Sequence, residues 1–354
     1  MDKSETAEHQ TDEGGGTLPQ EALDHLIYII GTARGGTSVL FDALGVHDDI
    51  LALPGMTHYM NQVWRYRNTV HMRLLRQIFR LPGFYDEEGV VRGLDTAAGR
   101  ELKRFIDDAL DSRDLKRMWQ VYPVVYALDK RNTKKAGDIR AWADKANDFY
   151  GVDKVAQAFP HGKFVFIVRD PRGAVASLAK RMAVKEEHTF EAAIDDGKVI
   201  EAAVSWRRMT QQILRFRKAY PERSILVRLE EFLSDPVGRL NDLFEFTVGK
   251  RMPEDLLSRR IDDLAYGTSH SPGDQGKGIR HEPIDRWKRV LTTEQEELIH
   301  LVTGRTGPKA GYIAGKSAMV AGSLPRILQR LPSAKRKLVV LSKILFLRGF
   351  ESLI

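Results

Sequence analysis

The segment that decides the fold is Leu26-Ile27-Tyr28-Ile29-Ile30-Gly31-Thr32-Ala33-Arg34-Gly35-Gly36-Thr37-Ser38. Its first five residues form a short apolar run, which is typical of a strand buried within a parallel sheet. A glycine-rich stretch follows at 31–38, and apolar residues then recur at helical spacing from Val39 to Leu44. A strand, a glycine loop and a helix in this order predict an anion-binding turn at the end of the strand.

The loop fits the phosphate-binding spacing G-x-x-x-x-G-K-[ST], except that Thr37 stands where lysine is expected. That lysine reaches the β- and γ-phosphates of a nucleoside triphosphate, so its absence disfavours triphosphate chemistry. The loop N–H groups and the start of the helix can still hold a phosphate-like group. Arg34, in the middle of the loop, is placed to contact such an anion. The alternative is a tight turn with a solvated arginine.

A second signature follows the apolar run Phe164-Val165-Phe166-Ile167-Val168, which predicts another buried strand. Arg169 ends this strand, Pro171 suits the first turn of a helix, and Ser177 lies two turns into it. Arg169 and Ser177 can together hold one phosphate at the carboxyl end of a sheet, where ligands bind in open parallel sheets. The alternative is an Asp-Pro helix start with surface arginines.

A third strand is predicted at 224–229, again followed by a helix. Strands that alternate with helices predict an α/β fold, here a P-loop-like three-layer fold with a central parallel sheet flanked by helices.

The two signatures in this order resemble the sulfotransferases that use 3′-phosphoadenosine-5′-phosphosulfate (PAPS). In that family a first loop, roughly P-[KR]-S-G-T-[ST], holds the 5′-phosphosulfate, and R-[DG]-x-R-x-x-x-x-S holds the 3′-phosphate. Other segments resemble family motifs in the same order, from about 26 to 305: Trp142-Ala143-Asp144-Lys145-Ala146, Phe159-Pro160-His161-Gly162-Lys163-Phe164, Val227-Arg228-Leu229-Glu230-Glu231-Phe232 with Asp235-Pro236, and Arg286-Trp287-Lys288 with Leu291-Thr292. Arg34 in place of lysine is similar to the tyrosylprotein and carbohydrate branches.

The resemblance implies roles for individual residues. Arg34 would stabilise the leaving phosphate and Lys145 would lie near the sulfuryl group, as catalytic residues, although a solvated Lys145 is the alternative. The 5′-phosphate would be held by Gly35, Gly36, Thr37 and Ser38. The 3′-phosphate would be held by Arg169 and Ser177, and a late basic loop with Lys277 and Arg280 would close over the cofactor. No metal is implied, and the sequence has no H-E-x-x-H or D-x-D motif.

The general base is where the sequence departs from the family. Many relatives carry a glutamate soon after the first helix, whereas this chain reads Pro54-Gly55-Met56-Thr57-His58. His58 is the nearest titratable group and a candidate base, because its ordinary pKa suits proton transfer near neutral pH. A structural role for His58 is the alternative. Trp206 is expected either to pack in the core or to stack near the adenine.

The leading hypothesis is therefore a PAPS-dependent sulfotransferase that releases 3′,5′-adenosine diphosphate (PAP). The acceptor would be a hydroxyl, with a glycan or glycolipid favoured. A P-loop-type small-molecule kinase and a non-catalytic sulfotransferase-like binding protein remain alternatives. The sequence leaves the oligomeric state unknown.

The chain divides into a flexible leader at 1–20, an α/β domain at 21–310 with a helical insertion at about 58–140, and a basic segment at 311–354. Residues 314–354 carry eight Lys or Arg and one acid, Glu351, which accounts for the net charge of +7. The near-neutral body gives no support for nucleic-acid binding. Residues 335–350 predict either an amphipathic helix on an anionic membrane or a helix packed on the domain.

The chain has no cysteine, which excludes a disulfide scaffold, a cysteine-ligated metal and a thiol nucleophile. We also expect no signal peptide and no membrane-spanning segment. These features favour a cytoplasmic protein, with peripheral membrane contact if the basic segment binds lipid.

Overall fold

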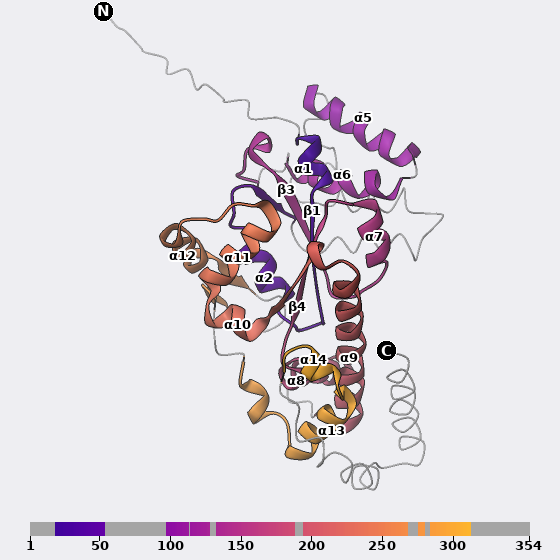
Figure 1. Cartoon of the computed structure of the whole chain (residues 1–354), viewed down its shortest axis with the longest axis vertical. Helices are drawn as coiled ribbons and strands as arrows, with labels where there is room; N and C mark the ends of the chain where they lie inside the picture. Colours follow the sequence, from indigo (N-terminus) through magenta and orange to yellow (C-terminus); the bar gives the residue numbers. More distant parts are fainter. Residues whose placement is uncertain are drawn as a thin grey trace, which may run out of the picture.

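The computed structural model describes residues 18–53, 97–112, 114–127, 132–187, 194–267, 275–279 and 284–312. Its centre is a five-stranded sheet in the order β2-β3-β1-β4-β5, and every neighbouring pair is parallel (Figure 1). The strands are β1 (Leu26–Gly31), β2 (Ile50–Ala52), β3 (Ala141–Ala146), β4 (Lys163–Val168) and β5 (Ser224–Arg228). The predicted α/β fold with a central parallel sheet is confirmed.

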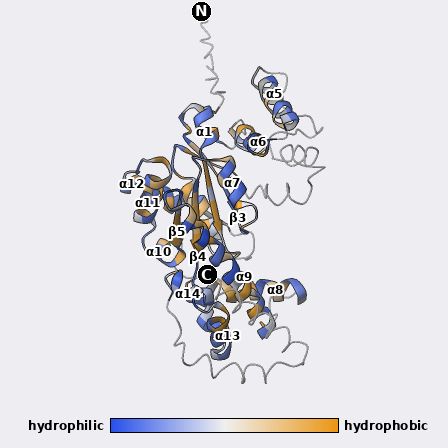
Figure 2. Ribbon diagram, turned by 45° about the vertical axis from the view of Figure 1, so that its right-hand side comes forward, coloured by the Kyte–Doolittle hydropathy of each residue, from blue (hydrophilic) through white to orange (hydrophobic). Residues whose placement is uncertain are grey.

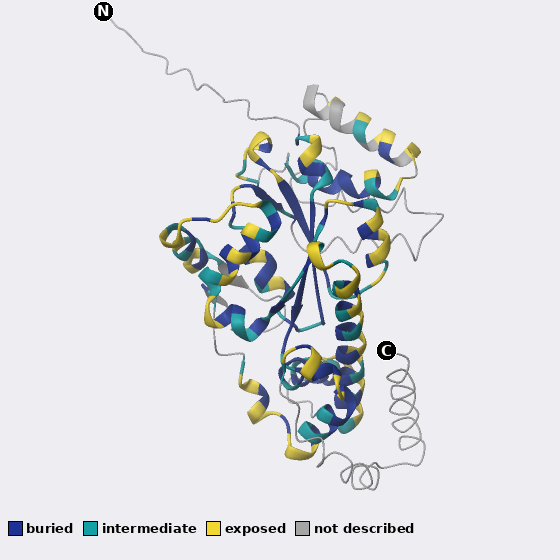
Figure 3. Ribbon diagram, in the orientation of Figure 1, coloured by how far each residue is buried: buried dark blue, intermediate teal, exposed yellow. Residues whose placement is uncertain are grey.

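Side chains of β1 alternate between the two faces of the sheet, as the pleat of a strand requires. Leu26, Tyr28 and Ile30 belong to one buried cluster, and Ile27 and Ile29 belong to another. The first face is covered by α1 (Gln20–Asp24), α6 (Leu115–Ala127), α7 (Val152–Ala158) and α9 (Asp196–Ala219). The second is covered by α2 (Thr37–Leu44), α10 (Leu229–Ser234), α11 (Pro236–Val248) and α12 (Glu254–Asp263). Figures 2 and 3 show the apolar, buried sheet between these helices.

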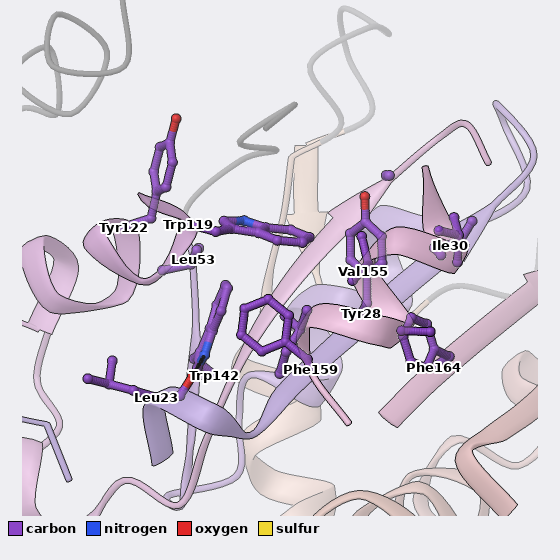
Figure 4. Close-up of a cluster of buried hydrophobic side chains, with 14 of the residues drawn as sticks. Leu23, Tyr28, Ile30, Leu53, Trp119, Tyr122, Trp142, Val155, Phe159 and Phe164 are labelled. Atoms are coloured by element: carbon purple, nitrogen blue, oxygen red, sulfur yellow. Dashed lines mark hydrogen bonds between the residues drawn. The ribbon is translucent and has the colours of Figure 1, made fainter. Parts of the chain in front are cut away.

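Aromatic rings make up much of the first cluster (Figure 4). Trp119 of α6 meets Trp142 of β3 edge-on at 5.7 Å between ring centroids, and both contact Phe159 in the same way. The indole of Trp142 also donates to the Leu23 carbonyl at 2.9 Å. This end of the chain is thereby fixed to the sheet, because a buried N–H needs a partner.

A third group of helices lies beyond the carboxyl end of β4. It comprises α8 (Pro171–Glu187), η3 (Arg286–Arg289), α13 (Thr293–Thr303) and α14 (Thr306–Lys309), which pack with part of α9 around their own core. A capping box between Thr292 and Gln295 starts α13. The buried Arg207 of α9 donates to the Val302 carbonyl at 2.7 Å and fixes α13 in place.

The remaining described elements are α5 (Ala97–Ser112), η1 (Ala136–Asp138), η2 (Pro221–Arg223) and the hairpin of β6 (Ala265–Gly267) and β7 (Gln275–Lys277). The predicted strands at 26–30, 164–168 and 224–229 are confirmed as β1, β4 and β5, and α8 begins at Pro171 as expected. Of the predicted insertion at 58–140, the described part contains α5, α6 and η1, while residues 54–96 lie outside the described residues. So do 1–17 of the leader and 313–354 of the basic segment. Within the described part, no helix combines the length and apolar character needed to cross a membrane.

Candidate anion-binding active site

The candidate site lies at the carboxyl edge of the sheet. The glycine loop leaves β1, Lys145 lies near the end of β3, and Arg169 follows β4 directly. Both neighbours of β1 are parallel to it, so these three ends lie at one edge. The connection from β1 runs through α2 on one face, whereas β3 and β4 continue into α7 and α9 on the other. Strands whose connections leave on opposite faces flank the usual ligand position in open α/β sheets.

The glycine loop has the backbone shape of an anion site. Arg34 and Gly36 both adopt left-handed conformations, with φ of 67° and 97°. A turn in which the Gly35 N–H donates to the Thr32 carbonyl at 2.8 Å joins them to β1. This curl turns successive N–H groups inward, and the start of α2 adds its partial positive charge. At Gly36 a side chain is excluded twice, by the positive φ and because a Cβ atom would lie 2.6 Å from Leu229 Cδ1.

The two predicted signatures meet in the structure. Arg34 Nε donates to Ser177 Oγ at 3.0 Å, although the two residues are 143 positions apart. Arg169 Nη1 approaches the Arg34 carbonyl oxygen at 3.5 Å. The first loop and the second signature therefore form one site.

Arg169 is a buried cation, with 8% of its surface exposed. Burial lowers its pKa, the nearby Arg34 lowers it further, and Glu230 opposes both. A guanidinium remains charged under these conditions. Two guanidinium groups at one place create a strongly positive site that a bound anion would stabilise.

Lys145 contacts the first loop rather than the second signature. Its Nζ lies 3.4 Å from Ser38 Oγ, 3.9 Å from Asp42 Oδ1 and 4.5 Å from the centre of the Phe41 ring. Burial lowers the pKa of Lys145, and the nearby Asp42 and Asp144 partly oppose this shift. Lys145 is therefore a second cation directed at the helix that starts the anion loop.

Sequence reasoning missed two side chains at this edge. Asn147 accepts a hydrogen bond from the Thr37 hydroxyl at 2.7 Å, through its Oδ1. Asp42 provides the carboxylate that faces Lys145. Asn147 follows Lys145 by two residues at the end of the same strand, and recognising β3 would have placed it. Asp42 lies one helical turn after Ser38, a spacing that puts both on one face of α2.

Further contacts join the second signature to the C-terminal helices. Arg172 forms an ion pair with Asp170 at 2.6 Å, and its guanidinium stacks 4.2 Å from the centre of the Trp287 ring. Trp206 is 2% exposed and its indole donates to the Arg169 carbonyl at 3.0 Å. Of the two roles expected for Trp206, the structure supports core packing.

Three expected site residues are not placed here. His58 and Arg280 lie outside the described residues, and Lys277 is described only as the last backbone position of β7. Across the described ranges, no group of three or more His, Asp or Glu side chains could hold a metal ion.

Comparison with known families gives a direct match. The model of the sulfotransferase family matches residues 27–248, which contain both anion signatures and Lys145. No curated protein matches the chain.

Solved structures agree on the fold. The sulfotransferase domain from the curacin biosynthetic pathway is 18% identical, with a TM-score of 0.50, over 85% of this chain and 100% of that chain. The sulfotransferase domain of a Synechococcus olefin synthase is 17% identical over 80% and 94%, with a TM-score of 0.46. Retinol dehydratase, in a complex with retinol and PAP, is 14% identical over 82% of each chain, with a TM-score of 0.39.

Proposed function

This chain belongs to the sulfotransferase family and is an enzyme of the sulfotransferase type, and from that premise we propose that it transfers the sulfuryl group of PAPS to an acceptor hydroxyl. The observation that carries the proposal is the 3.0 Å contact between Arg34 and Ser177. It joins a loop shaped for one anion to a buried arginine suited to a second. PAPS carries a phosphosulfate on its 5′ oxygen and a phosphate on its 3′ oxygen, so one nucleotide supplies both anions.

In the proposed reaction the acceptor oxygen forms a bond to sulfur, and the bond from sulfur to the bridging oxygen of the 5′-phosphate breaks. The hydroxyl proton leaves to a base, and PAP is released. Charge increases on the bridging oxygen during this step, and fixed cations that meet developing charge supply much of the catalysis in such transfers. Arg34 and Lys145 are the two cations nearest the loop, so we assign this stabilisation to them. His58 stays our candidate for the base.

The loop at 35–38 would hold the 5′-phosphate through its N–H groups and through the hydroxyls of Thr37 and Ser38. In the structure Thr37 donates to Asn147 and Ser38 lies near Lys145. These contacts fix the first turn of α2 against β3 and hold the loop in shape. Arg169 and Ser177 would hold the 3′-phosphate, with Lys277 and Arg280 closing from the late basic loop.

We further propose a glycan or glycolipid acceptor and a cytoplasmic enzyme that contacts membranes peripherally. Two sequence features support this proposal: Arg34 in place of lysine, and the basic, partly apolar segment at 335–350. Such a segment would bring a lipid-linked acceptor to the enzyme.

Calorimetric titration with PAP tests the cofactor assignment. The protein should bind PAP in the micromolar range, and Arg169→Ala should weaken binding at least about tenfold, or about 1.4 kcal/mol. The matched control is Arg259→Ala, which removes an equal charge from an exposed arginine on α12. Failure to bind PAP, together with binding of ATP and Mg²⁺, would overturn the proposal and favour the kinase alternative. PAP binding without turnover of any acceptor would indicate a non-catalytic binding protein.

A further inference from the structure

The backbone around Arg169 is held by side chains from three distant elements. The Tyr312 hydroxyl donates to the Val168 carbonyl at 3.1 Å. The Trp206 indole donates to the Arg169 carbonyl at 3.0 Å, and the Asp170 N–H donates to Glu230 Oε1 at 2.9 Å. Three successive residues at the end of β4 are therefore each held by a side chain.

These side chains, Trp206, Glu230 and Tyr312, are called the Arg169 clamp below. Trp206 comes from α9, Glu230 from α10, and Tyr312 follows α14. The clamp is closed on itself, because the Tyr312 hydroxyl also lies 2.8 Å from Glu230 Oε2. Glu230 thus uses one carboxylate oxygen for the strand end and the other for the tyrosine. Tyr312 also lies 6.5 Å from Trp206, ring to ring, at a steep angle.

Arg169 needs such support because its surroundings oppose its position. It is a buried cation beside a second guanidinium, and both effects favour its displacement toward water. Its backbone also lies past the last ladder hydrogen bonds of β4, where a chain ordinarily gains freedom. Room for the guanidinium exists only because residue 173 is glycine: a Cβ atom there would lie 2.7 Å from Arg169 Nε. A cation held in place before its ligand arrives loses less entropy when the ligand binds.

We propose that Trp206, Glu230 and Tyr312 are positioning residues that fix Arg169 for the 3′-phosphate, so that the clamp sets the preference for a 3′-phosphorylated nucleotide. This inference rests on the proposed function. It adds a requirement that the family match does not contain, because Tyr312 lies beyond residues 27–248. The C-terminal part of the domain therefore takes part in choosing the nucleotide.

The test compares two ligands that differ only in the 3′-phosphate, PAP and 5′-AMP. Tyr312→Phe removes one hydroxyl and keeps the ring. A hydrogen bond of this kind contributes enough that its loss should weaken PAP binding about fivefold. Binding of 5′-AMP should not change, because 5′-AMP makes no contact with Arg169. In turnover, KM for PAPS should rise while kcat and the acceptor KM stay within about twofold, a split that general loosening of the fold would not give.

Tyr220→Phe is the matched control. Tyr220 is a half-buried tyrosine that caps the end of α9 near the start of β5, at the opposite edge of the sheet. Removing its hydroxyl should leave both affinities unchanged. Trp206→Phe, which deletes the indole N–H and keeps an aromatic ring, should repeat the selective loss of PAP affinity. It also tests the clamp if Tyr312→Phe does not fold.

The outcomes separate the two proposals. A wild-type protein that binds PAP no better than 5′-AMP contradicts the proposed function. A wild-type preference for PAP that both Tyr312→Phe and Trp206→Phe retain contradicts the clamp alone. Equal loss of both ligands in the variants also contradicts it, since that result shows a general structural role.

Discussion

The two anion signatures are built in different ways. The loop after β1 takes its shape from neighbouring residues: left-handed Arg34 and Gly36, a turn closed at Gly35, and the start of α2. The position of Arg169 after β4 depends instead on side chains that come from up to 144 residues away. The first site is a local property of the sequence, and the second is a property of the assembled domain.

The difference has a consequence for mutations. Substitutions that disturb the first site must fall in or beside the loop, because the loop holds itself. Substitutions that disturb the second can fall in α9, in α10 or after α14, far along the chain. One contact joins the two sites, the hydrogen bond from Arg34 to Ser177. Breaking that contact should therefore give the largest effect.

Arg34→Ala removes the cation of the first site and its contact with the second. Loss of a donor that stabilises developing charge lowers kcat about 100-fold to 1,000-fold. The backbone strain at residue 34 is unchanged, because arginine already adopts a positive φ there and alanine is another non-glycine residue. Steady-state kinetics with PAPS and any active acceptor measure the effect, with Arg259→Ala as the charge-matched control. A kcat within about threefold of wild type would show that the two sites act without Arg34, contrary to its catalytic assignment.

Gly36→Ala and Gly173→Ala compare the two sites with the same added methyl group. At Gly36 the methyl meets Leu229 Cδ1 and a left-handed backbone. We expect a loss of stability of about 1–3 kcal/mol and weaker binding of both PAP and 5′-AMP. Thermal unfolding and calorimetry provide the two measurements.

At Gly173 the methyl meets Arg169 Nε within α8. Alanine favours a helix interior by up to about 1 kcal/mol over glycine, which offsets part of the contact strain. Stability should therefore change little, whereas PAP binding weakens about tenfold because the guanidinium moves. Binding of 5′-AMP should stay the same. If both glycine variants lose the two ligands equally, the two sites are not independent in the way described here.

The same contrast explains what could be predicted from the sequence. The loop at 31–38, β1 and β4 were predictable because apolar runs and glycine spacing are contiguous signals. The strand β3 was not predicted, since Asp144 and Lys145 interrupt its apolar pattern. Asp144 is nevertheless buried there, with a carboxylate oxygen that accepts from the Trp119 indole at 3.2 Å. β2 was missed because it has only three residues.

The site divides along the same line. Arg34, Arg169, Ser177 and Lys145 were identified through motifs, and the structure brings them to one edge of the sheet. Asn147 and Tyr312 act through contacts with residues more than a hundred positions away, and no local pattern marks them. Glu230 stood within a recognised motif, but its contact with Asp170 depends on where α10 lies beside the end of β4.

The smallest effect concerns pH and distinguishes the sites by charge type. The first site contains a lysine that can lose its proton, whereas the second depends on an arginine that does not. Burial lowers the pKa of Lys145 below its ordinary 10.5, although Asp42 and Asp144 oppose the shift. As pH rises, Lys145 in the free enzyme loses its charge earlier than an exposed lysine. The kcat/KM for PAPS should therefore fall on the alkaline side at a pH below 10.5.

Stability should move in the opposite direction over the same range. In the unfolded chain Lys145 keeps its proton up to its ordinary pKa, so between the lowered value and 10.5 the unfolded state binds more protons. The contribution of Lys145 to folding stability then rises with pH. Falling activity with no loss of stability would assign the alkaline limb to the site rather than to denaturation. Lys145→Arg should remove that limb, because guanidinium keeps its charge, and an unchanged limb in this variant would place the titrating group elsewhere.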